Sequence, residues 1–168
     1  MFPTSNRLAA LAAAMFLALA GTAARGADLP EPAGEVILTV SDASGEHVAR
    51  FDHAMLEALP QASVVTTTDW TDGQHTFTGP LARDVLAAAG VSGTTVDAGA
   101  LDDYHVTLPA ADFAEWDVIL AMTMDGEVLS VRDKGPLWIV YPRDEHPELA
   151  LPEINSRWVW QLQSLTLH

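Results

Sequence analysis

One short stretch, residues 133–142, constrains the fold of this chain more than any other. A charged turn leads into a Gly-Pro pair, five apolar or aromatic residues follow, and Pro142 ends the run. β-Branched and aromatic residues between breakers are typical of a short strand that is buried on both faces. Other elements therefore have to cover this strand from two sides. Arg132 and Lys134 lie just before the strand. If the protein binds an anionic or heteroaromatic ligand, we therefore expect the site to lie beside this strand.

The first 26 residues have the pattern of a secretory signal peptide. Arg7 is followed by an apolar run over residues 8–20, and small residues lead out to Ala24. A positive segment, a short apolar segment and a small-residue exit are the parts of a cleaved export signal. The competing interpretation is a membrane anchor, but the run is shorter than the ~18 residues that suggest a spanning helix. We expect residues 1–26 to be removed on export to the periplasm, with no membrane insertion of the mature chain.

The charge balance limits the partners of the mature chain. Removal of residues 1–26 leaves 6 cationic and 23 acidic residues, a net charge of −17. Such a surface repels nucleic acid and anionic lipid, so neither is expected as a partner. The sequence has no cysteine, so the core has to be held by packing without disulfides. It also offers no thiolate to a metal ion.

Hydrophobic periodicity predicts about eight strands, which follow a Pro-rich lead-in over residues 27–34. They include a hairpin over residues 35–51, a second hairpin turned at Asp125-Gly126, and a final strand over residues 157–167. The final strand has a period of two. This pattern places its two tryptophans, Trp158 and Trp160, on one face and favours their packing in the core.

Two helices are predicted. Asp52 is a candidate N-cap for residues 53–59, and a second helix over residues 81–89 is followed by a glycine stop. The segment 143–155, with several acids and two prolines, is predicted to be a loop. Since there are no internal repeats, we expect a single mixed α/β (α+β), sheet-dominated domain over residues 35–168.

Four segments of the chain share the order and spacing of motifs from a known family. Residues 77–86 run through Gly-Pro-Leu into a helix, and residues 104–129 contain a Tyr…Leu-Pro run, an acid, an apolar strand and Asp-Gly-Glu. Residues 134–142 contain Gly-Pro-Leu before a strand, and residues 156–159 read Ser-Arg-Trp-Val. Together they resemble the sulfite-oxidase-type molybdopterin-binding domain over about residues 62–167. The resemblance implies the fold of that family.

The sequence departs from this family at the metal site. The molybdenum ligand of the family is a cysteine in the loop after the strand matched by residues 64–68, where this chain has Thr67-Thr68-Asp69-Trp70. A threonine hydroxyl is not the strong, soft ligand that a thiolate is. The N-terminal cofactor-binding segment of the family also has no counterpart before Glu35. The resemblance therefore implies a pterin or molybdopterin-like ligand, with no molybdenum expected.

Several candidate binding residues lie near the buried strand or near residues 67–70, where the family has its metal-ligating cysteine. Trp70 is placed to stack on a flat heterocycle, and the structural alternative is a loop anchor packed into the core. Thr68 would supply a hydroxyl to the same pocket, although strand propensity alone also explains it. Arg132 and Lys134 would meet a polar edge of the ligand, unless they belong to a solvated turn.

Further candidates come from the resemblance and from the second helix. Arg157 matches a family lysine that meets the cofactor, and Ser156 precedes it in the same motif; a surface ion pair is the alternative for Arg157. Arg83 lies in the first helical turn, where a cation does not favour the helix dipole, so a neighbouring acid or a ligand is expected to hold it. Tyr104 is interpreted as a packing residue. The full candidate set is Thr68, Trp70, Arg83, Arg132, Lys134, Ser156 and Arg157.

The leading hypothesis is an exported pterin-binding protein that is not catalytic. Small exported proteins of this kind without the cysteine resemble periplasmic pterin-binding sensors, which implies the periplasmic domain of a membrane-bound signalling protein as a partner. One alternative is a molybdopterin-dependent oxidoreductase, or its subunit, with a non-cysteine metal environment. Another is an interaction module whose pocket has closed. The six histidines are dispersed, and neither a nucleophile elbow nor a phosphate-binding glycine loop is present.

Overall fold

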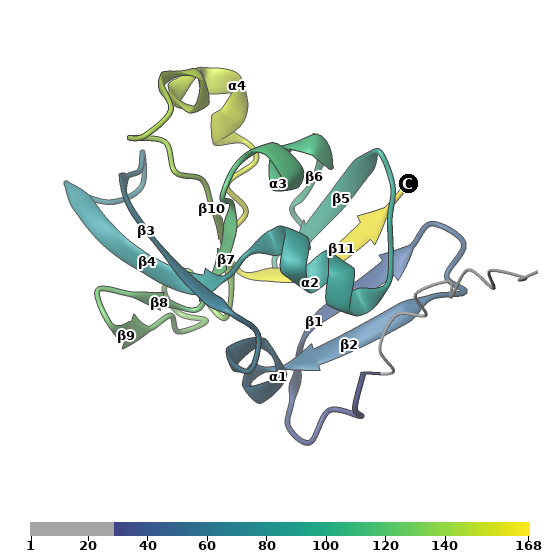
Figure 1. Cartoon of the computed structure of the whole chain (residues 1–168). Helices are drawn as coiled ribbons and strands as arrows, with labels where there is room; N and C mark the ends of the chain where they lie inside the picture. The colour runs from purple at the N-terminus through teal and green to yellow at the C-terminus, as the bar shows by residue number, and fades with distance from the viewer. Residues whose placement is uncertain (1–28) are drawn as a thin grey trace, which may run out of the picture.

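The computed structural model describes residues 29–168, so the signal peptide predicted for residues 1–26 lies outside the described part of the chain. The strands form a five-stranded, a four-stranded and a two-stranded sheet (Figure 1). The strands are β1 Val36–Asp42, β2 Val48–Asp52, β3 Gln61–Thr67, β4 Gln74–Pro80, β5 Thr95–Ala100, β6 His105–Pro109, β7 Ile119–Ala121, β8 Thr123–Met124, β9 Glu127–Val128, β10 Trp138–Val140 and β11 Leu162–Leu167. The helices are α1 His53–Glu57, α2 Ala82–Ala89, α3 Ala111–Glu115 and α4 Pro152–Asn155, with a 3-10 helix η1 Pro147–Ala150. The predicted sheet-dominated α+β fold is confirmed.

The five-stranded sheet has the order β2-β1-β11-β5-β6. β11 runs parallel to β1 and antiparallel to β5, so the strand that comes last in sequence lies in the middle of the sheet. The predicted hairpin over residues 35–51 is confirmed as the antiparallel pair β1 and β2. Leu38 and Val40 of β1 are buried with Leu165 and Leu167 of β11, as the alternation of a strand with one covered face requires.

The second sheet is built on the β3–β4 hairpin, to which β8 and β9 are added (Figure 1). The predicted turn at Asp125-Gly126 is confirmed, since both residues have the positive φ that a two-residue hairpin turn needs. β4 also lies close against β7, where Met122 N–H donates to the Thr78 carbonyl (2.8 Å). A side chain at Gly79 would overlap the backbone carbonyl of Leu120. Glycine at this position therefore permits the close approach of β4 and β7.

The apolar run of residues 137–141 is fully buried, as predicted. Its strand is shorter than predicted, because only β10 forms a ladder and β7 is its partner. On the other side, Ile139 N–H donates to the Val159 carbonyl (2.9 Å) and Leu162 N–H donates to the Leu137 carbonyl (3.0 Å). The run is therefore held between a strand and an irregular segment.

The prediction of a continuous strand over residues 157–167 is wrong. β11 begins at Leu162, and residues 157–161 are irregular. Gln161 has a positive φ of 52°, and its N–H donates to the Lys134 carbonyl (2.9 Å). Because this left-handed residue turns the chain, the segment before it follows residues 134–139 through single hydrogen bonds and forms no ladder.

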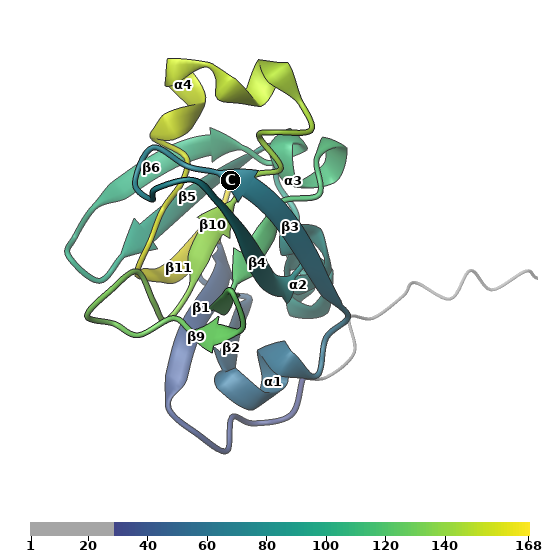
Figure 2. The same cartoon turned by 90° about the vertical axis from the view of Figure 1, so that its left-hand side faces the viewer.

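Segment 143–155 is not the plain loop that was predicted. It contains η1 and α4, and each of these short helices has a proline in its first turn, Pro147 and Pro152. Proline is well suited to that position because its φ is already helical and it has no N–H to satisfy. Figures 1 and 2 both place α4 at one end of the molecule and α1 at the other.

Asp52 is confirmed as the N-cap of the first helix. Its carboxylate accepts from Met55 N–H (2.9 Å), and it also accepts from the N–H groups of Ala33 and Gly34 (2.8 Å each). These hydrogen bonds lower the pKa of Asp52 and fix the lead-in segment against β2. Within residues 29–168, every helix is too short to span a lipid bilayer.

A histidine–carboxylate pair joins the β8–β9 turn to the start of β4. His75 Nδ1 donates to Asp125 Oδ2 (2.6 Å), and Thr76 N–H donates to Asp125 Oδ1 (2.9 Å). The hydrogen bond between the two side chains raises the pKa of His75 and lowers the pKa of Asp125. The pair is therefore expected to make stability depend on pH in two directions.

We expect the stabilisation by this pair to be greatest in mildly acidic solution. The raised pKa of His75 means that its contribution is complete below about pH 6.5 and is lost as pH rises through the folded-state pKa. The lowered pKa of Asp125 means that its contribution is present above about pH 3.8 and is lost as pH falls through the folded-state pKa. Urea midpoints of the wild type and of Asp125→Asn should differ most between these limits. A difference that does not change with pH would contradict the prediction.

Candidate functional site

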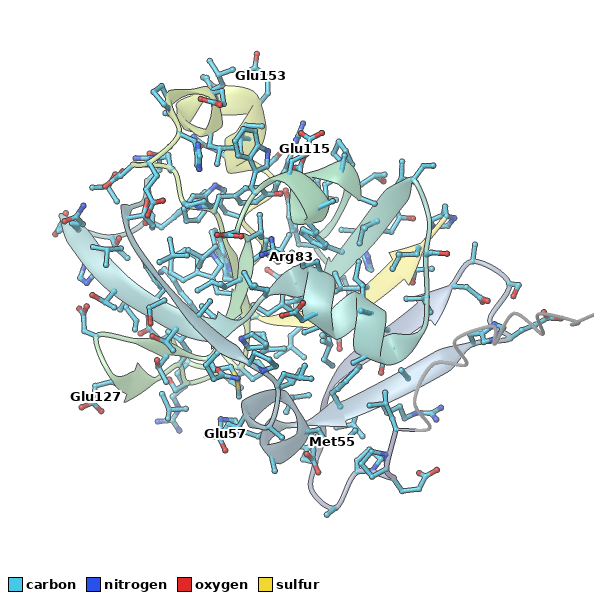
Figure 3. All side chains as sticks on the ribbon, viewed as in Figure 1. Met55, Glu57, Arg83, Glu115, Glu127 and Glu153 are labelled. Atoms are coloured by element: carbon cyan, nitrogen blue, oxygen red, sulfur yellow. The ribbon has the colours of Figure 1, made fainter. Side chains whose placement is uncertain are left out.

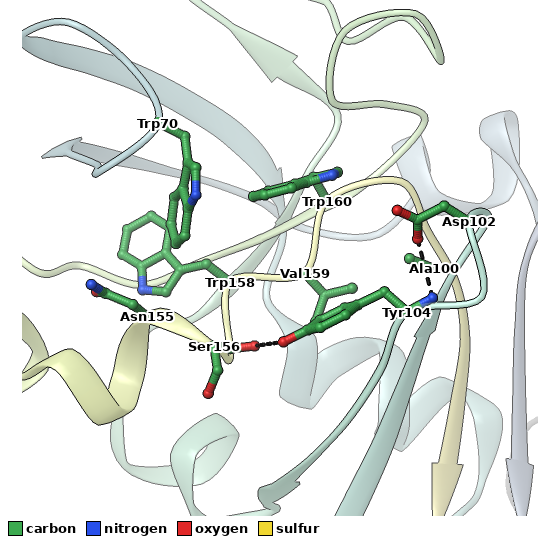
Figure 4. A pocket seen from close by; sticks show the side chains of 9 residues that line it. All are labelled: Trp70, Ala100, Asp102, Tyr104, Asn155, Ser156, Trp158, Val159 and Trp160. Atoms are coloured by element: carbon green, nitrogen blue, oxygen red, sulfur yellow. Dashed lines mark hydrogen bonds between the residues drawn. The ribbon is translucent and has the colours of Figure 1, made fainter.

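A half-open pocket of about 260 Å³ lies beside α4. The β3–β4 loop, the β5–β6 turn and the irregular segment after α4 meet around it (Figure 4). The lining residues are Trp70, Ala100, Asp102, Tyr104, Asn155, Ser156, Trp158, Val159 and Trp160. Its volume is slightly below the roughly 300–1,000 Å³ of sites for drug-sized ligands, so it suits a small flat molecule.

Three tryptophans, Trp70, Trp158 and Trp160, form one wall of this pocket, and Trp138 packs behind them. Trp70 lies 5.3 Å from Trp160, 6.0 Å from Trp158 and 6.3 Å from Trp138, measured between ring centroids. These separations are in the range of favourable aromatic pairs. Trp138 is the buried centre of the group and belongs to β10, whereas Trp70 and Trp160 are half-exposed. The place of Trp70 in this wall is compatible both with stacking on a ligand and with anchoring of its loop.

Lys134 lies beside the same wall. Its ammonium group is 5.5 Å from the ring centre of Trp138 and 5.7 Å from that of Trp160. A cation at this distance from an aromatic face is attracted to it. Lys134 is not part of the pocket lining, but it places a positive charge against two of the rings. Arg132 is exposed on the neighbouring turn.

The loop that carries Trp70 is held by a short network. The Thr68 hydroxyl accepts from Trp70 N–H (3.0 Å) and is hydrogen-bonded to the Thr71 hydroxyl (2.8 Å). Arg143 donates to Asp69 Oδ1 (2.7 Å), and the Asn155 amide donates to the other oxygen of Asp69. The Thr68 side chain thus shapes the loop below the pocket, and Asp69 ties the loop to α4.

The opposite side of the pocket is closed by Tyr104. Its hydroxyl donates to the Ser156 carbonyl (3.1 Å), and its backbone N–H donates to Asp102 Oδ1 (3.1 Å). Figure 4 shows the Tyr104 ring across the pocket from Trp70. Ser156, predicted to bind the cofactor, lines the pocket, and its hydroxyl donates to the Glu153 carbonyl (3.3 Å).

Arg157 follows the pocket-lining Ser156 but points to a buried acid. Its guanidinium donates to Asp112 Oδ2 (2.7 Å), which also accepts from the Tyr141 hydroxyl (2.9 Å). Burial, and then the negative charge of Asp112, raise the pKa of the Tyr141 phenol well above its usual value. The three side chains form a polar cluster next to the pocket and outside its lining.

The structure brings together only some of the predicted site residues. Trp70 and Ser156 line the pocket, while Lys134, Thr68 and Arg157 lie next to it without lining it. Arg83 is elsewhere, because it lies on α2 and points to the end of α3 (Figure 3). There it donates to Asp117 (2.7 Å), which is the neighbouring acid proposed as the alternative to a ligand.

Several lining residues were not predicted as site residues. Asp102 and Asn155 come from segments that sequence motifs did not single out. Trp158, Trp160 and Tyr104 were interpreted as packing residues, yet all three line the pocket. A signal was present in the sequence, because two of the five tryptophans of the chain, Trp158 and Trp160, lie two residues apart.

The aromatic lining of the pocket suits a flat ring, and the residues around it are not arranged as a metal site. At the metal position Thr68 is engaged within its own loop, and Asp69 is paired with Arg143. Residues 29–168 contain no group of three or more His, Cys, Asp or Glu side chains arranged for a metal ion. The lining contains a carboxylate and no cationic side chain, so it is also poorly suited to a phosphate. Its aromatic walls suit an uncharged heterocycle.

Comparisons with known proteins show the family and the fold. The model of the oxidoreductase molybdopterin-binding domain family matches residues 38–145. This confirms the resemblance found in the sequence motifs, although the matched segment begins and ends earlier than the motifs do. No curated protein matches the chain. Among solved structures, the sulfane dehydrogenase SoxCD from Paracoccus pantotrophus has a similar fold, with 18% sequence identity and a TM-score of 0.58 over 78% of this chain and 37% of that chain.

Proposed function

This chain belongs to the oxidoreductase molybdopterin-binding domain family, and on that premise we propose that it is an exported pterin-binding protein without catalytic activity of its own. The observation that carries the proposal is the pocket beside α4. It has flat aromatic walls from Trp70, Trp160 and Tyr104, in a sequence that has no cysteine to hold molybdenum. A scaffold of this family with an aromatic pocket and without the metal-ligating cysteine is suited to binding and not to oxo transfer.

The proposed role is that of a sensor in the periplasm, which reports the ligand to a membrane-bound signalling protein. The export pattern of residues 1–26 supports the location. The surface beside the pocket supports a partner, because Leu101 and Val131 are exposed there. Both are tied to the residue after Trp160: Leu101 N–H donates to the Gln161 carbonyl and the Gln161 amide donates to the Val131 carbonyl. A ligand that moves this segment would therefore move exposed apolar groups.

Calorimetric titration of residues 27–168 with pterin tests the proposal. Binding in the micromolar range is expected, and replacement of Trp70 by alanine should weaken it by roughly tenfold, since loss of one stacking ring costs about 1–3 kcal/mol. Trp116 stacks with His146 outside the pocket, so Trp116→Ala is the matched control and should leave the affinity unchanged. Absence of binding at high micromolar pterin would overturn the proposed function.

A second candidate function is a subunit of a molybdopterin-dependent oxidoreductase. The oxidoreductase description of the matching family favours it, as does the similarity in fold to a protein described as a sulfane dehydrogenase. Because the chain spans 37% of that protein, further domains or subunits would be needed for the activity. Elemental analysis of protein purified from cells that make the cofactor distinguishes the two functions. Stoichiometric molybdenum would favour the oxidoreductase.

A further inference from the structure

Two residues that line the pocket carry a buried hydrogen-bond donor and a buried acceptor that lack partners. Within residues 29–168, three buried side-chain nitrogen or oxygen atoms have no hydrogen-bond partner. Two of them, Trp158 Nε1 and Asn155 Oδ1, belong to residues that line the pocket, and the third is Trp138 Nε1. Buried polar atoms in proteins are nearly always paired. Two unpaired atoms of opposite kind at one pocket therefore point to a ligand that pairs with both.

The orientation of the Asn155 amide is determined by its other end. Its Nδ2 donates to Asp69 Oδ2, and Arg143 holds the same carboxylate through Oδ1 (2.7 Å). Because an acceptor at Asp69 requires the NH₂ group on that side, the carbonyl oxygen of Asn155 has to point the other way. The free acceptor is therefore a fixed feature of the site.

The Trp158 indole is held just as firmly. Its ring lies 5.8 Å from Tyr141 and 6.3 Å from Trp138 between centroids, and the side chain is almost completely buried. The indole N–H can only donate. In Figure 4 the ring nitrogen is on the side of the ring where Asn155 lies. The site thus presents one donor and one acceptor from neighbouring residues.

We propose that this pair selects a ligand with a cyclic amide at its edge. The ligand carbonyl accepts from Trp158 Nε1–H, and the adjacent ring N–H donates to Asn155 Oδ1. The inference rests on the proposed function, because the pyrimidinone ring of a pterin has such an edge. In the same orientation, a ring with an amino group in place of the carbonyl would place a donor against the Trp158 donor and an acceptor against the Asn155 acceptor. The pocket volume of about 260 Å³ limits the ligand to one or two fused rings.

Trp70 is the side chain placed to give way when such a ring enters. The two polar atoms are buried, so a ligand reaches them only after a neighbouring ring moves. Trp70 is half-exposed, lies 6.0 Å from Trp158 between centroids, and is carried by the loop between β3 and β4. Its outward movement would open the pocket and leave its ring free to cover the ligand.

The test compares pterin with 2,4-diaminopteridine, which has the same two rings and an amino group in place of the carbonyl. The wild type should bind pterin at least roughly tenfold more tightly than 2,4-diaminopteridine. The diamino compound loses the hydrogen bonds to Trp158 and Asn155 and places like groups against each other. Trp158→Phe keeps an aromatic ring and removes the N–H, so the preference should fall below about threefold. Trp116→Phe changes a tryptophan outside the pocket lining and should keep the full preference.

The outcomes separate this inference from the proposed function. Pterin binding without a preference over the diamino compound, or a preference that Trp158→Phe retains, would overturn the cyclic-amide inference and leave pterin binding intact. Binding of neither compound would overturn both. If Trp158→Phe does not fold, 3-methylpterin decides the matter with wild-type protein. Its methyl group replaces the ring N–H that faces Asn155, and affinity equal to that of pterin would overturn the inference.

Discussion

Replacing Gly79 by alanine is expected to lower the free energy of unfolding by about 3 kcal/mol or more. Gly79 lies on β4 where that strand passes β7, and a Cβ there would overlap the carbonyl carbon and oxygen of Leu120. Both obstacles are backbone atoms inside the sheet region, so no side chain can rotate to make room. The two strands would have to separate, and overpacking of this kind costs several kcal/mol when the surroundings cannot relax.

Urea unfolding monitored by tryptophan fluorescence measures this effect. Gly34→Ala is the matched control, because Gly34 has an ordinary backbone conformation and a Cβ there would meet only Asp52, at a normal van der Waals distance of 3.5 Å. The control should change stability by less than about 0.5 kcal/mol. Equal effects of the two substitutions would show that the approach of β4 and β7 is not tight.

Replacing Asp112 by alanine is expected to cost about 2–4 kcal/mol of stability. Its carboxylate accepts hydrogen bonds from Arg157 and from Tyr141, and its side chain is only 10% exposed. Removal leaves the Tyr141 hydroxyl buried without an acceptor and leaves the guanidinium without its counter-charge. Breaking one side of such a pair costs more than the pair contributes, because the remaining partner is poorly solvated.

The Arg83–Asp117 pair is a matched control for this prediction. Its nitrogen–oxygen distance of 2.7 Å equals that of Arg157–Asp112, but Asp117 is 71% exposed. Asp117→Ala should therefore cost less than about 1 kcal/mol, as is usual for ion pairs in water. Thermal unfolding of both variants measures the loss of stability for two ion pairs that have the same nitrogen–oxygen distance and differ in burial. Similar losses would mean that the cluster around Asp112 is hydrated.

Local signals were sufficient for most of the fold. The N-cap at Asp52, the turn at Asp125-Gly126 and the buried run of residues 137–141 all lie where their residue types indicated. Each of these rests on the conformational preference of a few adjacent residues. The segment 157–161 was misjudged because alternating tryptophans have the same pattern in a strand and in an irregular segment that borders a pocket.

The site was harder to predict because its contacts join distant parts of the chain. Asp112 and Arg157 are 45 residues apart, and Asp69 and Asn155 are 86 residues apart. With 23 acidic residues available, no sequence pattern indicates which acid each arginine will meet. Motif resemblance located the neighbourhood of Ser156. It did not reveal that Arg157 turns away from the pocket and that Asn155 turns toward it.

The central position of β11 has a consequence for when this protein can fold. Residues 162–167 fill the place between β1, formed by residues 36–42, and β5, formed by residues 95–100. Until those residues have been synthesised, the two strands have no neighbour to pair with on their facing edges. Pairing across such a sequence separation is slow to form. The five-stranded sheet can therefore be completed only after the last residues of the chain have been synthesised, whereas the β3–β4 hairpin and its neighbours β8 and β9 can pair earlier.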